Sequence, residues 1–316
     1  MRKYRPMPYD KPEFSGPATF MRLPATTDLE GADFTVVGVP FDTGGSWRVG
    51  CRFGPSAIRS ISRLLWPFDA QWRADIFDYV SGTDYGDLPV VPGYHEESNK
   101  RIAQALRPVM EAGVVPILLG GDHSITLPVL RAVANVHGPV ALIHLDSHLD
   151  TWDNYFGQPY WHGSPISRAV EEGLIDGTAS TQLGLRGGLD GPDVMESAER
   201  AGMKQFFAGV IHEIGWKPAI RDTLARARGH KVYLSFDVDF LDPSVAPGTG
   251  TPEVGGFGTR EAISFLRALE DLEFVGFDMV EVLPPFDPGE ITSLAAATMV
   301  YEFIRLLAAA KRQRTG

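Results

Sequence analysis

The stretch VALIHLDSHLD (residues 140–150) joins an almost unbroken apolar run to a cluster of aspartates and histidines. We predict a β-strand over 140–145 that is covered on both faces, because a strand with one face in water would alternate apolar and polar residues. KVYLSFDVDFLDP (231–243) repeats this arrangement, with aspartates directly after an apolar run. Strands of this kind lie in sheets that carry helices on both faces, so the two stretches favour an α/β fold.

Comparable apolar runs alternate with amphipathic stretches from residue 34 onward. The expected strands are 34–39, 115–120, 140–145, 181–185, 231–236 and 274–280, and the expected helices are 98–112, 125–134, 165–172, 218–228, 259–269 and about 290–312. This alternation implies a mainly parallel central sheet between two helical layers, a three-layer α/β/α sandwich. We expect residues 1–33, which are rich in proline, to form an extended arm, and residues 34–316 to form one catalytic domain.

Composition and charge exclude several classes of partner. The 316 residues are 44% hydrophobic, and 40 acidic against 29 basic side chains give a net charge of −11. Such a surface repels nucleic acid and anionic lipid, so we expect neither as a partner. No run reaches the roughly 18 apolar residues of a membrane span, and the N-terminus lacks the apolar core of a signal peptide. With a single cysteine, Cys51, a cytoplasmic location is expected.

Acidic and imidazole side chains follow the expected strands at the points where the strands end. In parallel α/β sheets, ligands bind outside the carboxyl ends of the strands. The residues found there are His123, Asp146, His148, Asp150, Asp237, Asp239 and Glu281.

The spacing of these residues predicts a metal site. Any one aspartate is more simply a turn or helix-cap residue, but two separate D-x-[HD] pairs directly after apolar strands favour metal ligands. Carboxylates gathered in one cleft repel each other unless cations are bound. The negative charges of four carboxylates balance the charge of two divalent ions. Carboxylate oxygens with two imidazoles suit Mn²⁺ best, with Ni²⁺, Co²⁺ or Zn²⁺ as alternatives. Two such ions would lower the pKa of a bridging water and so supply a nucleophile near neutral pH.

The motifs as a set resemble the ureohydrolases, the arginase and agmatinase family, and most closely the agmatinase branch. The resemblance rests on GGDHS (120–124), LDSHLDTWD (145–153), SFDVDFLDP (235–243) and GFDMVEVLPP (276–285), with support from 38–59, 246–257 and 290–302. It implies an arginase-like fold, a dinuclear manganese centre and hydrolysis of a guanidinium group to urea and an amine. It also implies a homotrimer or homohexamer, and a hetero-oligomer remains open.

The same resemblance implies roles for individual residues. The ligands of one metal would be His123, Asp146, Asp150 and Asp237, and those of the other Asp146, His148, Asp237 and Asp239. Asp150 would also pass a proton to the leaving amine, and His162 would shuttle protons at the mouth of the site. Glu281 would receive the guanidinium in a charge-assisted, potentially bidentate pair.

Other positions near the motifs are interpreted as structural. His144 lies inside an apolar strand and is interpreted as a core residue. Arg48 and Arg52 are expected to hold the 41–54 loop. Ser147, where the family commonly has alanine, is expected to face away from the metals.

The 151–167 loop bears on the choice of substrate. It carries Trp152, Asp153 and Trp161 and no lysine or arginine, and we expect these three residues to contact the substrate tail. Indole faces attract apolar or cationic groups and an aspartate attracts an ammonium, whereas neither holds a carboxylate. Agmatine is therefore the first candidate, with 4-guanidinobutyrate, an alkylguanidine or a biguanide as alternatives.

Two functions of other classes share parts of this pattern. A two-metal phosphoesterase can share the D-x-H motif, but phosphoryl transfer needs Lys or Arg clamps, and the motifs here are acidic. A non-catalytic subunit of a heteromeric ureohydrolase would keep the fold, but the presence of all six ligands with His162 and Glu281 argues against it.

Overall fold

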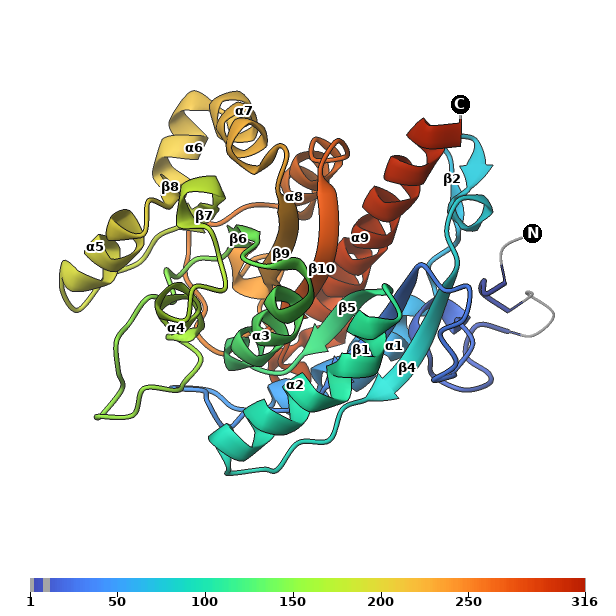
Figure 1. Ribbon diagram of the computed structural model, residues 1–316, viewed down its shortest axis with the longest axis horizontal. Coiled ribbons are helices and arrows are strands. Elements are labelled where there is room, and N and C mark those ends of the chain that lie inside the picture. Colours follow the sequence, from blue (N-terminus) through green and yellow to red (C-terminus); the bar gives the residue numbers. More distant parts are fainter. Residues whose placement is uncertain (1–2, 8–11, 316) are drawn as a thin grey trace.

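An eight-stranded sheet forms the centre of the molecule (Figure 1). The computed structural model describes residues 3–7 and 12–315, so residues 1–2 and 8–11 of the expected arm and Gly316 lie outside the described part. The strand order is β4-β1-β5-β10-β9-β6-β7-β8, and every neighbouring pair is parallel. The sheet is thus entirely parallel among the described residues, which confirms the expected fold class.

The six predicted strands are present, with ends within one residue of those expected. The sheet strands are β1 (Phe34–Val39), β4 (Gly82–Asp87), β5 (Val115–Gly120), β6 (Ala141–Leu145), β7 (Thr181–Leu185), β8 (Lys204–Phe207), β9 (Lys231–Asp237) and β10 (Glu273–Val280). The two strands of this sheet that were not predicted, β4 and β8, are its edges. A separate antiparallel hairpin pairs β2 (Phe68–Asp69) with β3 (Ala74–Asp75).

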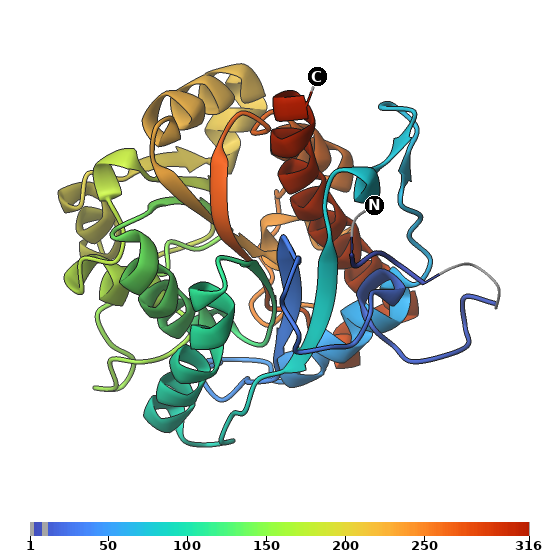
Figure 2. The same ribbon diagram turned by 45° about the vertical axis from the view of Figure 1, so that its right-hand side comes forward.

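Helices cover both faces of the sheet, as Figure 2 shows from a second direction. One layer holds α2 (His95–Glu111), α3 (Thr126–His137), α4 (Pro165–Glu171) and α5 (Asp193–Arg200). The other holds α1 (Gly54–Ser62), α6 (Ala208–Ile214), α7 (Trp216–Ala227), α8 (Thr259–Arg267) and α9 (Ile291–Thr315). Successive residues of β5 enter opposite cores, Ile117 and Leu119 on the α9 side and Leu118 on the α2 side. Burial on both faces explains the unbroken apolar runs.

The long helix α9 corrects one expectation. By length and composition alone it could span a membrane, with a mean hydropathy of 1.4 in its 18-residue window, so the expectation that no such stretch exists is wrong. However, 72% of that window is buried inside the protein, where α9 packs against α1, α8 and β10. A helix that is apolar on most sides is typical of a protein core as well as of a membrane.

The described part of residues 1–33 is anchored to the domain. Phe20, Met21 and Leu23 are fully buried in the core on the α9 side. The backbone N–H of Phe20 donates to Asp84 on β4 at 2.8 Å, and Ala25 forms a parallel bridge with the same residue. This segment therefore covers part of the β4 edge of the sheet.

Candidate metal centre

The four central strands bring the candidate residues together. β5, β10, β9 and β6 are consecutive neighbours in the sheet, and because they are parallel their carboxyl ends meet at one edge. The residues that follow them there are His123 after β5, Glu281 after β10, Asp237 and Asp239 at the end of β9, and Asp146, His148 and Asp150 after β6. Residues far apart in sequence thus meet in one cluster.

The inner half of this cluster is centred on His123. Its Nδ1 atom lies 3.0 Å from Asp146 Oδ2, 3.0 Å from Asp150 Oδ2 and 3.1 Å from Asp237 Oδ2. All four residues are buried. Burial, together with the neighbouring charges of Asp239 and Asp146, raises the pKa of Asp237 well above its ordinary value. Asp237 is therefore destabilised as an anion by its carboxylate neighbours, whereas the adjacent His144, His123 and His148 outweigh burial and hold the pKa of Asp146 well below its ordinary value. Bound cations would relieve the repulsion at Asp237.

A buried polar chain lies behind His123. Ser235 Oγ is 2.8 Å from His123 Nε2 and 2.7 Å from Asp278 Oδ1. The other oxygen of Asp278 accepts hydrogen bonds from Tyr233 and Thr126, each at 2.8 Å. Because Ser235 gives its only hydroxyl proton to the carboxylate, it accepts from His123 Nε2–H. The Nδ1 lone pair is thereby directed at the carboxylate cluster, as a metal-binding histidine requires.

The outer half of the cluster is built on His148. Its Nδ1 lies 3.1 Å from Asp239 Oδ2 and 3.5 Å from Asp146 Oδ1. We expect from the sequence that Ser147 faces away from the metals, but its hydroxyl donates to Asp239 Oδ1 at 2.7 Å. The expectation is wrong because β6 ends at Leu145, so the alternation of side chains along a strand no longer applies at this position.

The cluster fits metal ions. Ligand atoms of His123, His144, Asp146 and Asp150 lie within 4.8 Å of one another, and so do those of Asp146, His148 and Asp239. Asp146 belongs to both groups, as a bridging ligand would. Its Oδ2 and that of Asp239 are buried and make no hydrogen bond of acceptable geometry with any described residue. Buried carboxylate oxygens that face histidine nitrogens without a well-formed hydrogen bond are costly, and a cation between them would satisfy both groups.

His144 lies closer to this cluster than a purely structural core residue would. Its side chain is fully buried, as expected. Its Nδ1 is 3.1 Å from Gln182 Nε2, and its Nε2 is 2.9 Å from Asp146 Oδ2. This proximity could not be predicted from the sequence, since an apolar strand gives no sign of the face on which a single histidine lies.

Glu281 and His162 form a pair beside the metal cluster. Glu281 Oε1 accepts from the backbone N–H of His123 and lies 2.9 Å from His162 Nδ1, while Oε2 accepts from the Cys51 thiol at 3.1 Å. The backbone N–H of Ser46 donates to His162 Nε2, which in the neutral ring leaves the proton on Nδ1, facing Glu281. Glu281 has a φ of +62°, a conformation that is strained for a non-glycine residue and that the surrounding contacts must hold in place.

A further buried carboxylate, Asp122, was not predicted. Burial and the nearby charge of Glu281 raise its pKa to about 7. Its oxygens accept from the backbone N–H of Gly44 at 2.7 Å and from Ser124, so it ties the 41–54 loop to the metal cluster. Within that loop Arg52 pairs with Asp42, which confirms its structural role. The sequence feature that could have identified Asp122 is its position directly before the candidate ligand His123.

A cavity of about 210 Å³, the mouth cavity, opens beside this cluster. Trp152 and Trp161 line it, with ring centroids 5.9 Å apart. Asp153 does not line it: the side chain is 81% exposed and pairs with Arg168 at 2.8 Å. Glu253 also lines the cavity, together with Asp150 and Asp237 of the cluster. The backbone carbonyl of Glu253 accepts from Arg186 at 2.9 Å, whereas its carboxylate makes no ion pair or hydrogen bond with another described residue. Arg48 is also outside the cavity, packed over Phe286.

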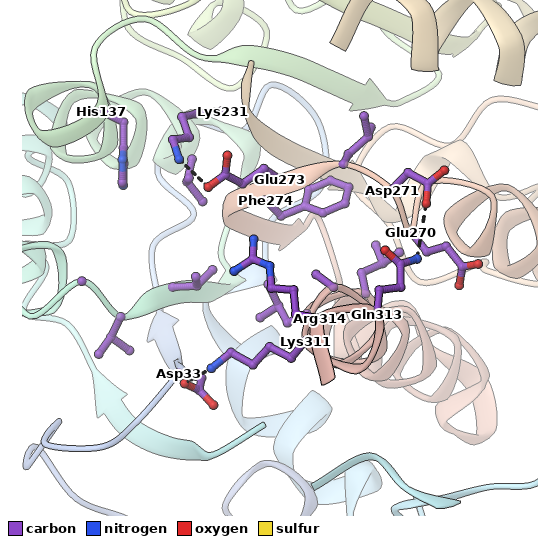
Figure 3. Close-up of a pocket in the computed structure, with 18 of the residues that line it drawn as sticks. Asp33, His137, Lys231, Glu270, Asp271, Glu273, Phe274, Lys311, Gln313 and Arg314 are labelled. Carbon is purple, nitrogen blue, oxygen red and sulfur yellow. Dashed lines mark hydrogen bonds and ion pairs between the residues drawn. The ribbon is translucent and has the colours of Figure 1, made fainter. Parts of the chain in front are cut away.

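A larger cavity, of about 510 Å³, lies at the other end of the sheet (Figure 3). It is bounded by the start of β5 and β10 and the end of α9. Most of its charges are paired, Lys311 with Asp33 and Lys231 with Glu273. Among the described residues, neither group of possible metal ligands lies there, so its size does not make it a catalytic site.

Comparison with known proteins agrees with this geometry. The Arginase family model matches residues 32–305. The chain belongs to the arginase family. It is 43% identical to a guanidinopropionase of Pseudomonas aeruginosa over 98% of both chains, and 40% identical to a mitochondrial agmatinase of Gallus gallus over 94% of this chain and 87% of that protein.

The fold comparison gives the same result. The structure of proclavaminate amidino hydrolase from Streptomyces clavuligerus is 38% identical, with a TM-score of 0.92, covering 95% of this chain and all of that one. The arginase-like fold and the ureohydrolase assignment made from the sequence motifs are therefore confirmed, and this member of the arginase family is an enzyme.

Proposed function

We propose that the chain is a two-metal amidinohydrolase that hydrolyses the guanidinium group of a small compound to urea and an amine. The observation that carries the proposal is the convergence of three carboxylates on His123 Nδ1 beside Glu281. Oxygen ligands with a few imidazoles suit Mn²⁺ best, with Ni²⁺, Co²⁺ or Zn²⁺ less specifically. Two bound divalent ions would supply Lewis acidity and lower the pKa of water.

The residues around the metals divide the remaining work. Glu281 binds the guanidinium. Both lone pairs of its Oε1 are engaged by His123 and His162, so the free position is on Oε2, where Gly250 leaves room. Glu281 would then bind the guanidinium through Oε2 alone, and not in the bidentate pair considered from the sequence. Asp150 takes a proton from the attacking water and passes it to the leaving nitrogen as the C–N bond breaks. His162, with its proton on Nδ1 in the neutral ring, exchanges protons at the rim.

The mouth cavity favours a cationic or neutral tail. Its two indoles offer faces for an apolar chain or an ammonium, and the unpaired carboxylate of Glu253 would attract a positive charge and repel a negative one. No lysine or arginine is among the described residues that line it. We therefore keep agmatine as the first candidate and apolar alkylguanidines or biguanides as the next.

A guanidino acid such as 4-guanidinobutyrate is the second candidate. The observation in its favour is the 43% identity to a guanidinopropionase over nearly the whole chain. A carboxylate tail would need a cationic partner, and the candidates Arg48 and Arg168 lie outside the mouth cavity and are engaged elsewhere. Either would have to turn toward the substrate.

A urea-release assay on a guanidine panel tests the proposal. The panel holds agmatine, a neutral alkylguanidine, 4-guanidinobutyrate, 3-guanidinopropionate and arginine, with protein loaded separately with Mn²⁺ and Ni²⁺. We expect urea from agmatine or the alkylguanidine at the highest kcat/KM. A generic phosphodiester, run in parallel, tests the phosphoesterase alternative. Absence of urea with every guanidine, while both metals are bound, would contradict the proposal and favour a non-catalytic subunit.

Assembly and location are further proposals. The single cysteine favours a cytoplasmic location, and the resemblance to the ureohydrolases implies a homotrimer or homohexamer. Size-exclusion chromatography with light scattering on the purified protein measures the assembly, and a partner that co-purifies in fixed ratio would indicate a hetero-oligomer.

A further inference from the structure

Ser147 stands between two candidate ligands and contacts a third. It separates Asp146 from His148 in sequence, and its side chain is 1% exposed. Its hydroxyl lies 2.7 Å from Asp239 Oδ1, and its backbone N–H donates to the same oxygen at 3.1 Å. One oxygen of Asp239 is therefore held twice by a single neighbouring residue.

The hydroxyl of Ser147 can donate to only one of two nearby acceptors. Ser147 Oγ also lies 3.1 Å from His148 Nδ1, but the hydroxyl has one hydrogen, and a carboxylate is the stronger acceptor. Donation to Asp239 leaves the Nδ1 lone pair of His148 without a hydrogen bond from this hydroxyl. That lone pair is then available to a metal.

The other oxygen of Asp239 faces the same point. Asp239 Oδ2 is buried, makes no hydrogen bond of acceptable geometry with any described residue, and lies 3.1 Å from His148 Nδ1. Oδ1 is thus committed to the protein, while Oδ2 and Nδ1 converge on one position. This division fixes which oxygen is presented and in which direction, as hydrogen-bond partners of metal ligands do.

We propose that Ser147 is a positioning residue for the outer metal, holding Asp239 so that its Oδ2 and His148 Nδ1 bind one ion. The inference rests on the two-metal centre of the proposed function. In this proposal each ion is supported by a different serine. Ser147 serves the outer ion, whereas Ser235, which connects His123 to Asp278, serves the inner one. Among the described residues, Ser147 forms hydrogen bonds with Asp239 and approaches His148, and it forms none with Ser235 or Asp278.

The test is metal binding by Ser147→Ala, which removes the hydroxyl and leaves the backbone N–H in place. Metal-free protein is titrated with Mn²⁺ in a calorimeter, and ions retained after dialysis are counted by mass spectrometry. We expect wild-type protein to retain two ions per chain. In the variant one site should bind as before, and the other should weaken about tenfold or more, the usual effect of losing a partner of a metal ligand.

Two further variants separate positioning from general structure. Ser62→Ala removes another fully buried hydroxyl, which bonds Met21 and Arg59 and touches no candidate ligand, and it should retain both ions. Ser147→Thr keeps the hydroxyl and should recover part of the lost affinity. Electron paramagnetic resonance of Ser147→Ala with one Mn²⁺ retained should show an isolated ion in place of a coupled pair.

The outcomes are distinct. Two ions bound to Ser147→Ala with wild-type affinity would overturn the inference, and so would equal loss of metal from Ser62→Ala. Failure of wild-type protein to bind a second ion would overturn it together with the two-metal centre. Wild-type protein that binds two ions but releases no urea from any guanidine would contradict the proposed function and leave the inference on Ser147 intact.

Discussion

The floor of the site (His123, Asp146, Asp150, Asp237, Asp239 and Glu281) and the mouth cavity are held in place by different means. The floor residues follow four adjacent parallel strands and are all buried. The mouth cavity is lined by loop residues such as Trp152, Trp161 and Glu253. Strand ends fix where the chemistry occurs, whereas loops decide which tail can enter. Variants of the two regions should therefore fail in different ways.

The largest effect is expected at the centre of the floor. Asp237→Ala removes a carboxylate that contacts His123 through one oxygen and accepts from the backbone N–H of Asp239 through the other. We expect turnover to fall below detection and bound metal to fall below two ions per chain, since the proposed bridging ligand serves both. An active variant with two full equivalents of metal would show that Asp237 is not part of the floor.

A smaller effect is expected where the floor meets the substrate. Glu281→Gln removes the charge proposed to pair with the guanidinium but keeps the shape of the side chain. We expect kcat/KM to fall by roughly 100-fold, about 3 kcal/mol, as for the loss of a charge-assisted hydrogen bond in a buried site. Metal content should stay at two ions. Kinetics equal to wild type on the best guanidine would refute the role of Glu281.

Variants of the mouth cavity should change the substrate preference and leave metal binding unchanged. Trp152→Ala removes an indole that lines the mouth cavity and bonds Asp190 through Nε1. We expect kcat/KM for agmatine or an alkylguanidine to fall relative to that for a guanidino acid. The loss of transition-state binding that this reflects should be about 0.5–2 kcal/mol. Metal analysis serves as the control. Loss of metal without a change in preference would place Trp152 among the supports of the floor.

The smallest effect is expected from Glu253→Gln, which neutralises the unpaired carboxylate of the mouth. The interaction with a substrate ammonium is partly exposed to water, so we expect about 1 kcal/mol, close to a fivefold loss of kcat/KM for agmatine. The neutral alkylguanidine provides a matched control and should be unaffected. If 4-guanidinobutyrate is already the best substrate of the wild type by about tenfold, the reading of the mouth is wrong, and a turned Arg48 becomes the first candidate anchor.

The sequence predicted the interior of the fold better than its edges. Six strands with apolar runs were found because burial on both faces selects such runs. The edge strand β4, GTDYGD, is half-exposed and polar, and β8 has four residues, so neither carries that signal. Helix α1 begins directly after the 41–54 loop and has only nine residues, too few to show a clear period.

The candidate site shows the same division. His123, Asp146 and Asp237 could be named because they lie at the end of an apolar strand or within three residues of it. Ser147 was misjudged because the strand had already ended, and Asp150 has a φ of +53°, which no alternation rule describes. Glu253 is 100 residues from Asp153 in sequence, and only the folded loops show which of the two reaches the mouth cavity.

The most direct test of the account is the urea released as metal is returned to the stripped enzyme. Metal-free wild-type protein is titrated with Mn²⁺, and both bound ions per chain and urea from the best guanidine of the panel are measured at each step. We predict that activity rises with loading and reaches its plateau at two ions per chain. Full activity at one ion, or none at two with any guanidine, would contradict a two-metal amidinohydrolase.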